Sequence, residues 1–143
     1  MNRNSFKFFY TLRVRYAEVD AQGIVFNAHY LTYFDCGITE YYREIKYNYF
    51  QEVKKSKKDF HVIKTTLNYK KPIVFDQKID IGVKVSKIGN SSLNFNLAIF
   101  ENNKKKLLAY GNLVQVYADQ LKKCSTPLEK KFIEKIKKFE NNL

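Results

Sequence analysis

The sequence predicts a single α+β domain in which one long apolar helix packs against an antiparallel sheet of about five strands. Two patterns support this expectation. Several runs alternate apolar and polar residues, as half-buried strands do, and one long stretch repeats apolar residues every three or four positions, as a helix does. Short polar turns between the alternating runs favour antiparallel hairpins. We expect residues 1–143 to form one domain, with a core over about residues 6–117.

The first half of the chain contains a strand, a turn and the long helix. Residues 6–16 place an apolar side chain at every second position, which predicts a half-buried strand. Residues 18–23 follow with Asp and Gly, which favour a turn. From about 28 to 45 the apolar spacing becomes helical and covers most of the circumference, so other structure should cover this helix on more than one side.

The second half predicts four more strands and a second helix. A lysine-rich segment, expected to be a loop, comes first, with Lys54, Lys55, Lys57 and Lys58. The alternating runs that follow predict strands over residues 61–69, 79–85, 93–99 and about 107–117. Apolar residues at helical spacing then predict an amphipathic basic helix over about 126–140.

Charge is the most unusual feature of the composition. The chain has 26 Lys and Arg against 14 Asp and Glu, a net charge of +12, and the excess lies in residues 54–143. A basic half suits a nucleic acid, an anionic cofactor or an acidic protein, and biased composition would also produce it. Because lysines predominate and do not interleave with aromatic residues on one face, we expect no nucleic acid as a partner.

The cysteines and the hydropathy of the sequence indicate whether a metal site is expected and where in the cell the protein is located. Cys36 and Cys124 lie far apart, without a CxxC spacing or a nearby histidine pair, which argues against a zinc site and a disulfide scaffold. We therefore expect no metal, and two reduced thiols. No stretch is apolar and long enough for a membrane span, and the first residues lack a secretory leader, so a cytoplasmic location is expected.

Residues 18–30 combine the features that acyl transfer needs. Asp20 places a carboxylate at the end of the first strand, and seven residues later the helix starts near Asn27. The first turn of a helix presents unpaired N–H groups and a partial positive charge. A carboxylate can act as nucleophile or base, and N–H groups can stabilise an oxyanion. Alternatively, Asp20 closes an Asx-turn and Asn27 is an ordinary helix cap.

The string RYAEVDAQGIVFNAHY, residues 15–30, resembles the signature of hotdog-fold acyl-CoA thioesterases of the 4-hydroxybenzoyl-CoA thioesterase type. That signature is an Asp, two residues, a Gly, an apolar run containing Val, and a Tyr that opens the central helix. The resemblance covers about residues 10–117 and includes Asn68 to Pro72 and Asp76. It implies the hotdog fold, an α+β architecture in which a curved antiparallel sheet wraps one central helix.

The resemblance also implies roles for individual residues. Asp20 would be the catalytic carboxylate, which either attacks the thioester carbonyl or activates water, and the backbone N–H of Asn27 would polarise that carbonyl. The residues expected to bind substrate are Gly23, Ile24, Val25, Phe26, His29 and Tyr30. Relatives work as homodimers, and many are homotetramers built as dimers of dimers. No metal or other cofactor is implied, since CoA enters only as part of the substrate.

One departure leaves the acyl carrier open. Where the family places arginines that hold the CoA phosphates, at the second hairpin turn, residues 88–92 contain none, and the nearest cation is Lys87. An acyl-ACP thioesterase is therefore an alternative, because the net charge would also attract an acidic carrier protein. A non-catalytic acyl-binding hotdog protein is a further alternative.

Other polar residues have less specific expectations. His29 could touch substrate or only begin the helix, whereas His61 is expected to be structural. Glu18 should be exposed or paired with a nearby arginine, and on an extended strand it would share a face with Asp20. Glu40 could line the pocket of a partner subunit or make a structural hydrogen bond. Cys36 is expected in the core because no basic group activates it.

Overall fold

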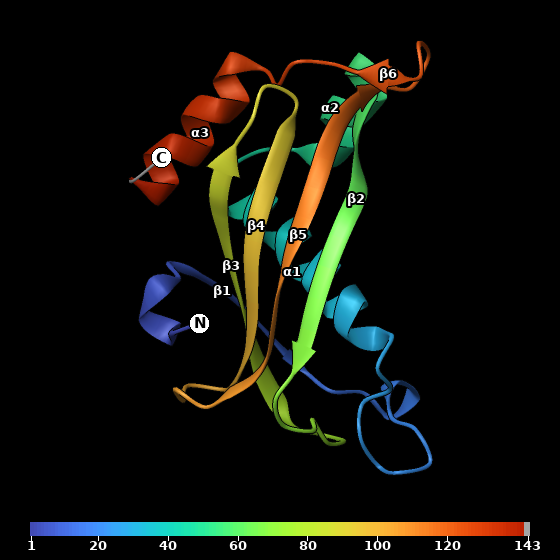
Figure 1. The fold of residues 1–143 in the computed structure, drawn as a ribbon, viewed down its shortest axis with the longest axis vertical. Coiled ribbons are helices and arrows are strands. Elements are labelled where there is room, and N and C mark those ends of the chain that lie inside the picture. Colours follow the sequence, from blue (N-terminus) through green and yellow to red (C-terminus); the bar gives the residue numbers. More distant parts are fainter. Residues whose placement is uncertain (142–143) are drawn as a thin grey trace.

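The computed structural model describes residues 1–141, which form a curved antiparallel sheet around helix α1 (His29–Glu44) (Figure 1). The strand order across the sheet is β1-β3-β4-β5-β2, and the short strand β6 pairs with β5. The strands are β1 (Phe8–Arg13), β2 (Lys58–Tyr69), β3 (Lys78–Ile88), β4 (Ser92–Glu101), β5 (Leu107–Asp119) and β6 (Cys124–Ser125). Two further helices are α2 (Tyr49–Ser56) and α3 (Lys130–Glu140). The predicted α+β fold is confirmed.

Helix α1 lies in the concave side of the sheet and packs its apolar face into the core. Its buried residues recur three and four positions apart and share one apolar cluster with the inward-facing residues of β3, β4 and β5. The helix approaches the sheet closely at Gly37, where an added Cβ atom would lie 2.7 Å from the Cγ2 atom of Ile81. The helix predicted over about 28–45 is thus confirmed, and its apolar girth is explained by the sheet that curves around it.

The first strand is shorter than its alternating sequence predicts. Phe6 precedes β1 and packs on the outer face of the sheet, against Phe9 and Phe100, instead of in the main core. Tyr16 lies in a 3-10 turn, η2 (Tyr16–Glu18), and is 81% exposed. The single strand expected over 6–16 is therefore wrong at both ends. The alternation continues beyond β1 because a second, smaller apolar cluster uses Phe6.

The lysine-rich segment that was expected to be a loop contains the end of helix α2, which includes Lys54 and Lys55, and the start of β2 at Lys58. The side chain of Asn48 accepts a hydrogen bond from the N–H of Gln51 and caps the helix start. Lys57 adopts a left-handed conformation, with φ 58°, and ends the helix. The loop expectation was wrong because a run of lysines is compatible with a helix whose polar face meets water.

Helix α3 begins at Lys130, four residues later than the pattern predicts. The preceding residues are extended: the N–H groups of Thr126 and Leu128 donate to the carbonyl oxygens of Tyr117 and Asn90, both at 2.9 Å. Pro127 disfavours a helical conformation for the residue before it. Leu128 is buried, so its apolar character reflects core packing outside the helix.

The end of α3 docks onto an uncovered part of β3. The carboxylate of Glu140, which is 3% exposed, accepts hydrogen bonds from the Tyr41 hydroxyl (2.9 Å) and from the N–H of Val85 (3.0 Å). Strand β1 pairs with β3 only as far as Val83. Glu140 therefore satisfies a backbone donor of β3 that no neighbouring strand reaches.

A second buried carboxylate ties the N-terminal segment to the sheet. Asp80 is 1% exposed and accepts hydrogen bonds from Thr11 (2.6 Å), Arg3 (2.7 Å), Asn102 (2.8 Å) and the N–H of Asn103 (2.8 Å). Burial alone would raise the pKa of Asp80, but these hydrogen bonds outweigh it and hold the pKa below its ordinary value. The ionised form of Asp80 thus stabilises the fold.

We predict that Asp80→Asn lowers the free energy of unfolding by about 2 kcal/mol at pH 7, because the change removes charged hydrogen bonds from a buried site. The lowered pKa means that Asp80 stabilises the fold above its unfolded-state pKa of about 3.9, and that this stabilisation is lost as pH falls through the folded-state pKa. Urea unfolding at several pH values measures both effects. The gap between wild type and variant should narrow in acid.

The exposed Asp76, which pairs with Arg13, supplies the control. Asp76→Asn should change stability by less than about 1 kcal/mol at pH 7. A gap between wild type and Asp80→Asn that stayed constant down to pH 3 would contradict the role given to the Asp80 charge.

Candidate functional site

The loop that carries Asp20 is a tight hairpin between β1 and α1. Val19 and Val25 form a β-bridge, and the N–H of Asp20 donates to the carbonyl oxygen of Ile24 at 2.9 Å. The N–H of Gly23 donates to the carbonyl oxygen of Asp20 at 2.9 Å and closes the turn. Gly23 has φ +75°, a conformation that residues with a Cβ atom rarely adopt, so the turn favours glycine here.

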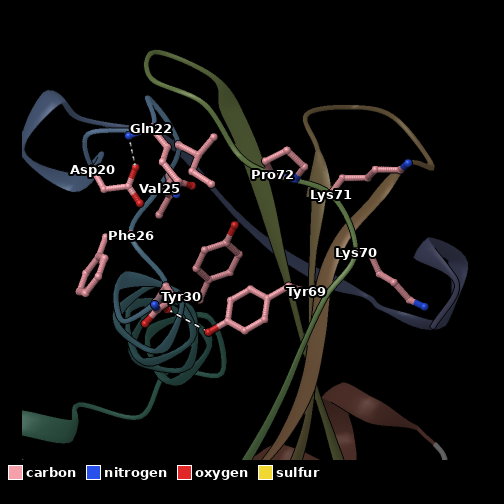
Figure 2. A pocket seen from close by; sticks show the side chains of 11 residues that line it. Asp20, Gln22, Val25, Phe26, Tyr30, Tyr69, Lys70, Lys71 and Pro72 are labelled. Carbon is pink, nitrogen blue, oxygen red and sulfur yellow. Dashed lines mark hydrogen bonds between the residues drawn. The ribbon is translucent and has the colours of Figure 1, made fainter.

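The chain that follows β2 lies against this hairpin. The N–H of Val25 donates to the carbonyl oxygen of Ile73 at 2.8 Å, and Ile24 forms a β-bridge with Val74. A cleft of about 630 Å³ lies between the hairpin, the start of α1 and the end of β2 (Figure 2). Its lining residues are Asp20, Gln22, Ile24, Val25, Phe26, Asn27, Tyr30, Tyr69, Lys70, Lys71 and Pro72.

The Asp20 carboxylate lines the cleft and uses one oxygen within its own turn. Oδ1 accepts a hydrogen bond from the N–H of Gln22 at 2.8 Å, an Asx-turn that Figure 2 marks with a dashed line. No hydrogen bond within residues 1–141 uses the other oxygen, Oδ2. Asp20 therefore closes the turn, as one interpretation of the sequence expected, and retains an oxygen for another partner.

Asn27, which lies just before α1, lines the same cleft. The helix begins at His29, and Ala28 before it is already helical, so Asn27 does not cap the helix as one interpretation expected. The carbonyl oxygen of Phe26 accepts the N–H of His29 at 3.0 Å and thus points along the helix. In a trans peptide the next N–H, that of Asn27, points the opposite way. Throughout the described chain, that N–H donates no hydrogen bond.

Aromatic side chains form the apolar wall of the cleft. Tyr30 is 3% exposed and packs edge-on against Tyr69, with the ring centroids 4.8 Å apart. The Tyr69 hydroxyl donates to the carbonyl oxygen of Asn27 at 3.2 Å, which joins the end of β2 to the helix start (Figure 2). Burial raises the pKa of Tyr30, so its hydroxyl stays neutral. Phe26 packs edge-on against His29 at the rim and remains 45% exposed.

A scan for known families places the chain within one of them. A model described as "Thioesterase superfamily" matches residues 22–107, which span the helix and most of the sheet. The chain belongs to the thioesterase superfamily. The resemblance to hotdog-fold thioesterases is therefore confirmed, and with it the class of enzyme, a thioester hydrolase.

Individual members of this superfamily are similar over nearly the whole chain. The acyl-CoA thioester hydrolase YbgC of Escherichia coli O6:H1 is 28% identical over 134 residues, which cover 94% of this chain and 98% of that protein. A thioesterase from Thermus thermophilus, solved in complex with coenzyme A and Zn, has a TM-score of 0.82 and 24% identity, over 97% of this chain and 98% of that one. A 1,4-dihydroxy-2-naphthoyl-CoA thioesterase from Synechocystis has a TM-score of 0.84 and 13% identity, over 90% of this chain and 94% of that one. The two solved structures show that the fold is shared.

Six of the eight residues singled out from the sequence line the cleft: Asp20, Ile24, Val25, Phe26, Asn27 and Tyr30. Gly23 shapes the turn and His29 packs against Phe26, and neither Gly23 nor His29 is among the lining residues. Sequence reasoning missed Gln22 and the segment from Tyr69 to Pro72. The resemblance included that segment, but its periodicity predicted only the end of a strand.

The other polar candidates have structural partners. Glu18 is buried and pairs with Arg15, which confirms the expected arginine partner, but it lies in the 3-10 turn η2 and not on an extended strand beside Asp20. Glu40 pairs with Arg43 on the same helix. His61 hydrogen-bonds to Gln120, and neither lines the cleft.

Metal ligands and membrane segments were also searched in the part of the chain that the structure describes. Residues 1–141 contain no cluster of three or more His, Cys, Asp or Glu side chains that could hold a metal ion. Over the same range, none of the helices has the length and apolar character needed to cross a membrane.

Proposed function

We propose that this chain hydrolyses acyl-CoA thioesters to the free acid and CoA. In this proposal Asp20 is the catalytic carboxylate, the N–H of Asn27 is the oxyanion donor, and Ile24, Val25, Phe26 and Tyr30 surround the acyl group. The reaction is proposed to occur in the cytoplasm without a resident metal or other cofactor, CoA being part of the substrate. The name of the E. coli relative, acyl-CoA thioester hydrolase, supports this substrate class.

The observation that carries the proposal is that Asp20 and Asn27 line the same cleft, and that the N–H of Asn27 donates no hydrogen bond within residues 1–141. A thioester carbonyl needs an electrophilic contact at oxygen and a nucleophile at carbon. The partial positive charge at the start of α1 favours the negative charge that develops on that oxygen. The apolar wall around Tyr30 and Tyr69 suits the acyl group, which carries no charge near the reacting carbon.

The chemistry follows from these two groups. In the first route, Asp20 accepts a proton from water as the water oxygen attacks the carbonyl carbon, and the N–H of Asn27 stabilises the resulting oxyanion. The oxyanion then reforms the carbonyl, the C–S bond breaks, and the CoA thiolate receives the proton. In the second route, the Asp20 carboxylate attacks the carbon itself, the C–S bond breaks and the CoA thiolate leaves, which gives an anhydride between Asp20 and the acyl group. Water then hydrolyses this anhydride to the free acid and the Asp20 carboxylate, and the proton that the water loses goes to the CoA thiolate. Both routes need the ionised carboxylate.

Asp20→Asn should lower kcat for acyl-CoA hydrolysis by at least about 100-fold, because the amide keeps the shape of the side chain but can act neither as base nor as strong nucleophile. Release of free thiol from short, medium, long and aromatic acyl-CoA esters measures this and identifies the preferred acyl group. Thermal unfolding of the variant serves as the control. Equal activity of wild type and variant would show that Asp20 only closes the turn. If neither hydrolyses any of the esters, an acyl-binding protein or an acyl group carried by a protein would be favoured.

An acyl carrier protein is the second candidate for the carrier, and the lysines at the cleft favour it. Lys70 and Lys71 line the rim, and their backbone N–H groups donate to the carbonyl oxygen of Leu108, which holds the rim against the basic hairpin between β4 and β5. That hairpin contains Lys104, Lys105 and Lys106. Such a surface suits the phosphates of CoA or the acidic surface of a carrier protein.

If a carrier protein docks here, replacing Lys70 and Lys71 together by Gln should lower kcat/KM for acyl-ACP about 10-fold, and wild-type kcat/KM should fall steeply between about 0.05 and 0.5 M salt. The matched control replaces Lys54 and Lys55, an adjacent pair on α2, and should leave kcat/KM unchanged. A weak salt dependence on acyl-ACP together with efficient turnover of acyl-CoA would exclude the carrier protein as the preferred substrate.

We further propose that two copies pair through β2, in keeping with the homodimers that the resemblance implies. β2 ends the strand order and leaves one edge unpaired. Its Val62, Ile63 and Tyr69 are 51%, 64% and 53% exposed, and Leu31 on α1 is 45% exposed. A long edge strand with apolar side chains is rarely left in water. Tyr69 of this strand also lines the cleft, so a second copy paired along β2 would lie next to the site.

Wild-type protein should therefore have twice the mass of one chain by size exclusion with light scattering, and Ile63→Asp should shift it toward the monomer and lower kcat at least about 10-fold, because water then enters the cleft. Leu121→Asp is the control, since Leu121 is 78% exposed in the turn after β5. A wild-type protein that is active as a monomer, or an Ile63→Asp variant that remains dimeric with full activity, would contradict this assembly. A tetramer that dissociates to dimers in the variant would show that β2 forms one of the two interfaces of a dimer of dimers.

A further inference from the structure

The loop that carries Asp20 is attached to α1 through a buried carboxylate that takes no part in the proposed chemistry. Glu18 is 4% exposed, and its Oε2 accepts hydrogen bonds from the Tyr33 hydroxyl (2.7 Å) and from the N–H of Arg15 (2.9 Å). Its Oε1 accepts from the guanidinium of Arg15, with Nε at 2.7 Å and a second nitrogen at 2.6 Å. One carboxylate thus joins the start of the loop, the segment just after β1 and the N-terminal part of the helix.

The main chain of Glu18 extends this connection to the far side of the loop. Its carbonyl oxygen accepts the N–H of Phe26 at 2.9 Å. Residues 19–25 are therefore a closed hairpin whose two ends meet at Glu18, with Asp20 on one arm and Asn27 immediately beyond the other. A displacement of Glu18 would move both groups relative to each other and to α1.

Electrostatics keep this connection in its charged form. Burial alone would raise the pKa of Glu18, but the hydrogen bonds from the Arg15 N–H, the Tyr33 hydroxyl and the Arg15 guanidinium outweigh it and lower the pKa below its ordinary value. Burial and the adjacent carboxylate raise the pKa of Tyr33, which keeps its hydroxyl as a donor. Charge-assisted hydrogen bonds of this kind are short and directional, so they restrict the position of the loop.

We propose that Glu18, held by Tyr33 and Arg15, is the positioning residue of this site: it sets the distance between the Asp20 carboxylate and the Asn27 N–H without touching substrate. This inference rests on the proposed function, because it assigns a purpose to the spacing of those two groups. Small displacements of catalytic groups lower the reaction rate by large factors. Replacing a positioning residue should therefore lower kcat measurably.

The structure provides a matched control for this role. Tyr33 and Tyr41 both lie on α1, both are buried, and both donate to a buried glutamate, Glu18 at 2.7 Å and Glu140 at 2.9 Å. Tyr→Phe removes the same hydroxyl from each pair. The Tyr41–Glu140 pair holds α3 and β3, not the catalytic loop. A purely structural role predicts the same outcome for both variants, whereas a positioning role separates them.

The experiment compares wild type with Tyr33→Phe, Tyr41→Phe and Glu18→Gln, using the acyl-CoA that wild type hydrolyses best. We expect comparable falls in Tm for the two tyrosine variants. Well below the Tm, kcat should fall about 10-fold in Tyr33→Phe and more in Glu18→Gln, with KM nearly constant, and should stay at the wild-type value in Tyr41→Phe. Equal kcat for the two tyrosine variants would overturn the inference, even if Asp20→Asn were inactive.

Amide hydrogen exchange of residues 19–27 provides a readout that does not depend on turnover. Exchange in this segment should be faster in Tyr33→Phe and Glu18→Gln than in wild type, and unchanged in Tyr41→Phe. If wild type hydrolyses no thioester, the proposed function fails, and the exchange data still decide whether Glu18 holds the loop. Unchanged exchange in Tyr33→Phe and Glu18→Gln would show that it does not.

Discussion

The hydroxyl groups of the tyrosines on α1 impose the main constraint on this fold. The helix approaches the sheet closely enough at Gly37 to exclude even a methyl group. Tyr33, Tyr41 and Tyr42 are consequently buried, and a buried hydroxyl without a partner is costly. Each donates to a buried acceptor at 2.6 to 2.9 Å, namely Glu18, Glu140 and Gln115. These acceptors come from the 3-10 turn η2 before the Asp20 hairpin, from α3 and from β5, so one helix fixes the position of three distant parts of the chain.

This constraint explains which parts of the fold could be predicted from the sequence. In β3 and most of β4, apolar residues that face the core alternate with polar or small residues that face outward. This local pattern is enough to locate the strands. The partners of the tyrosines are separated from them by 15, 99 and 73 residues, and no local pattern records such pairs. The prediction that Phe6 belongs to the first strand was wrong for a similar reason, because Phe6 packs in an outer cluster with Phe100, a distant residue on β4.

The candidate site likewise has one part that could be predicted from local sequence and one part that could not. Asp20 and Asn27 could be predicted as site candidates because both arms of the hairpin lie within one short segment. That segment combines a carboxylate, a glycine that favours a turn, and the start of a helix. The opposite rim, Tyr69 to Pro72, could not, since long-range contacts bring it to the cleft: the backbone of Val25 and Ile24 pairs with Ile73 and Val74, and Tyr69 contacts the start of α1. Those contacts also explain why a loop contains Ile24 and Val25: both pair with the second rim, and Val25 is in the core.

Electrostatic considerations connect the site to its surroundings. An N–H dipole and a carboxylate influence a reaction strongly only where water is excluded, because the interaction between charges weakens as the effective dielectric constant rises. In a single chain the cleft is bounded by a 45% exposed Phe26 and a 53% exposed Tyr69. Tyr69 belongs to β2, the edge strand of the sheet. Covering this edge would remove apolar surface from water and lower the dielectric constant around Asp20 together, so in the proposed dimer assembly and catalysis would depend on the same burial.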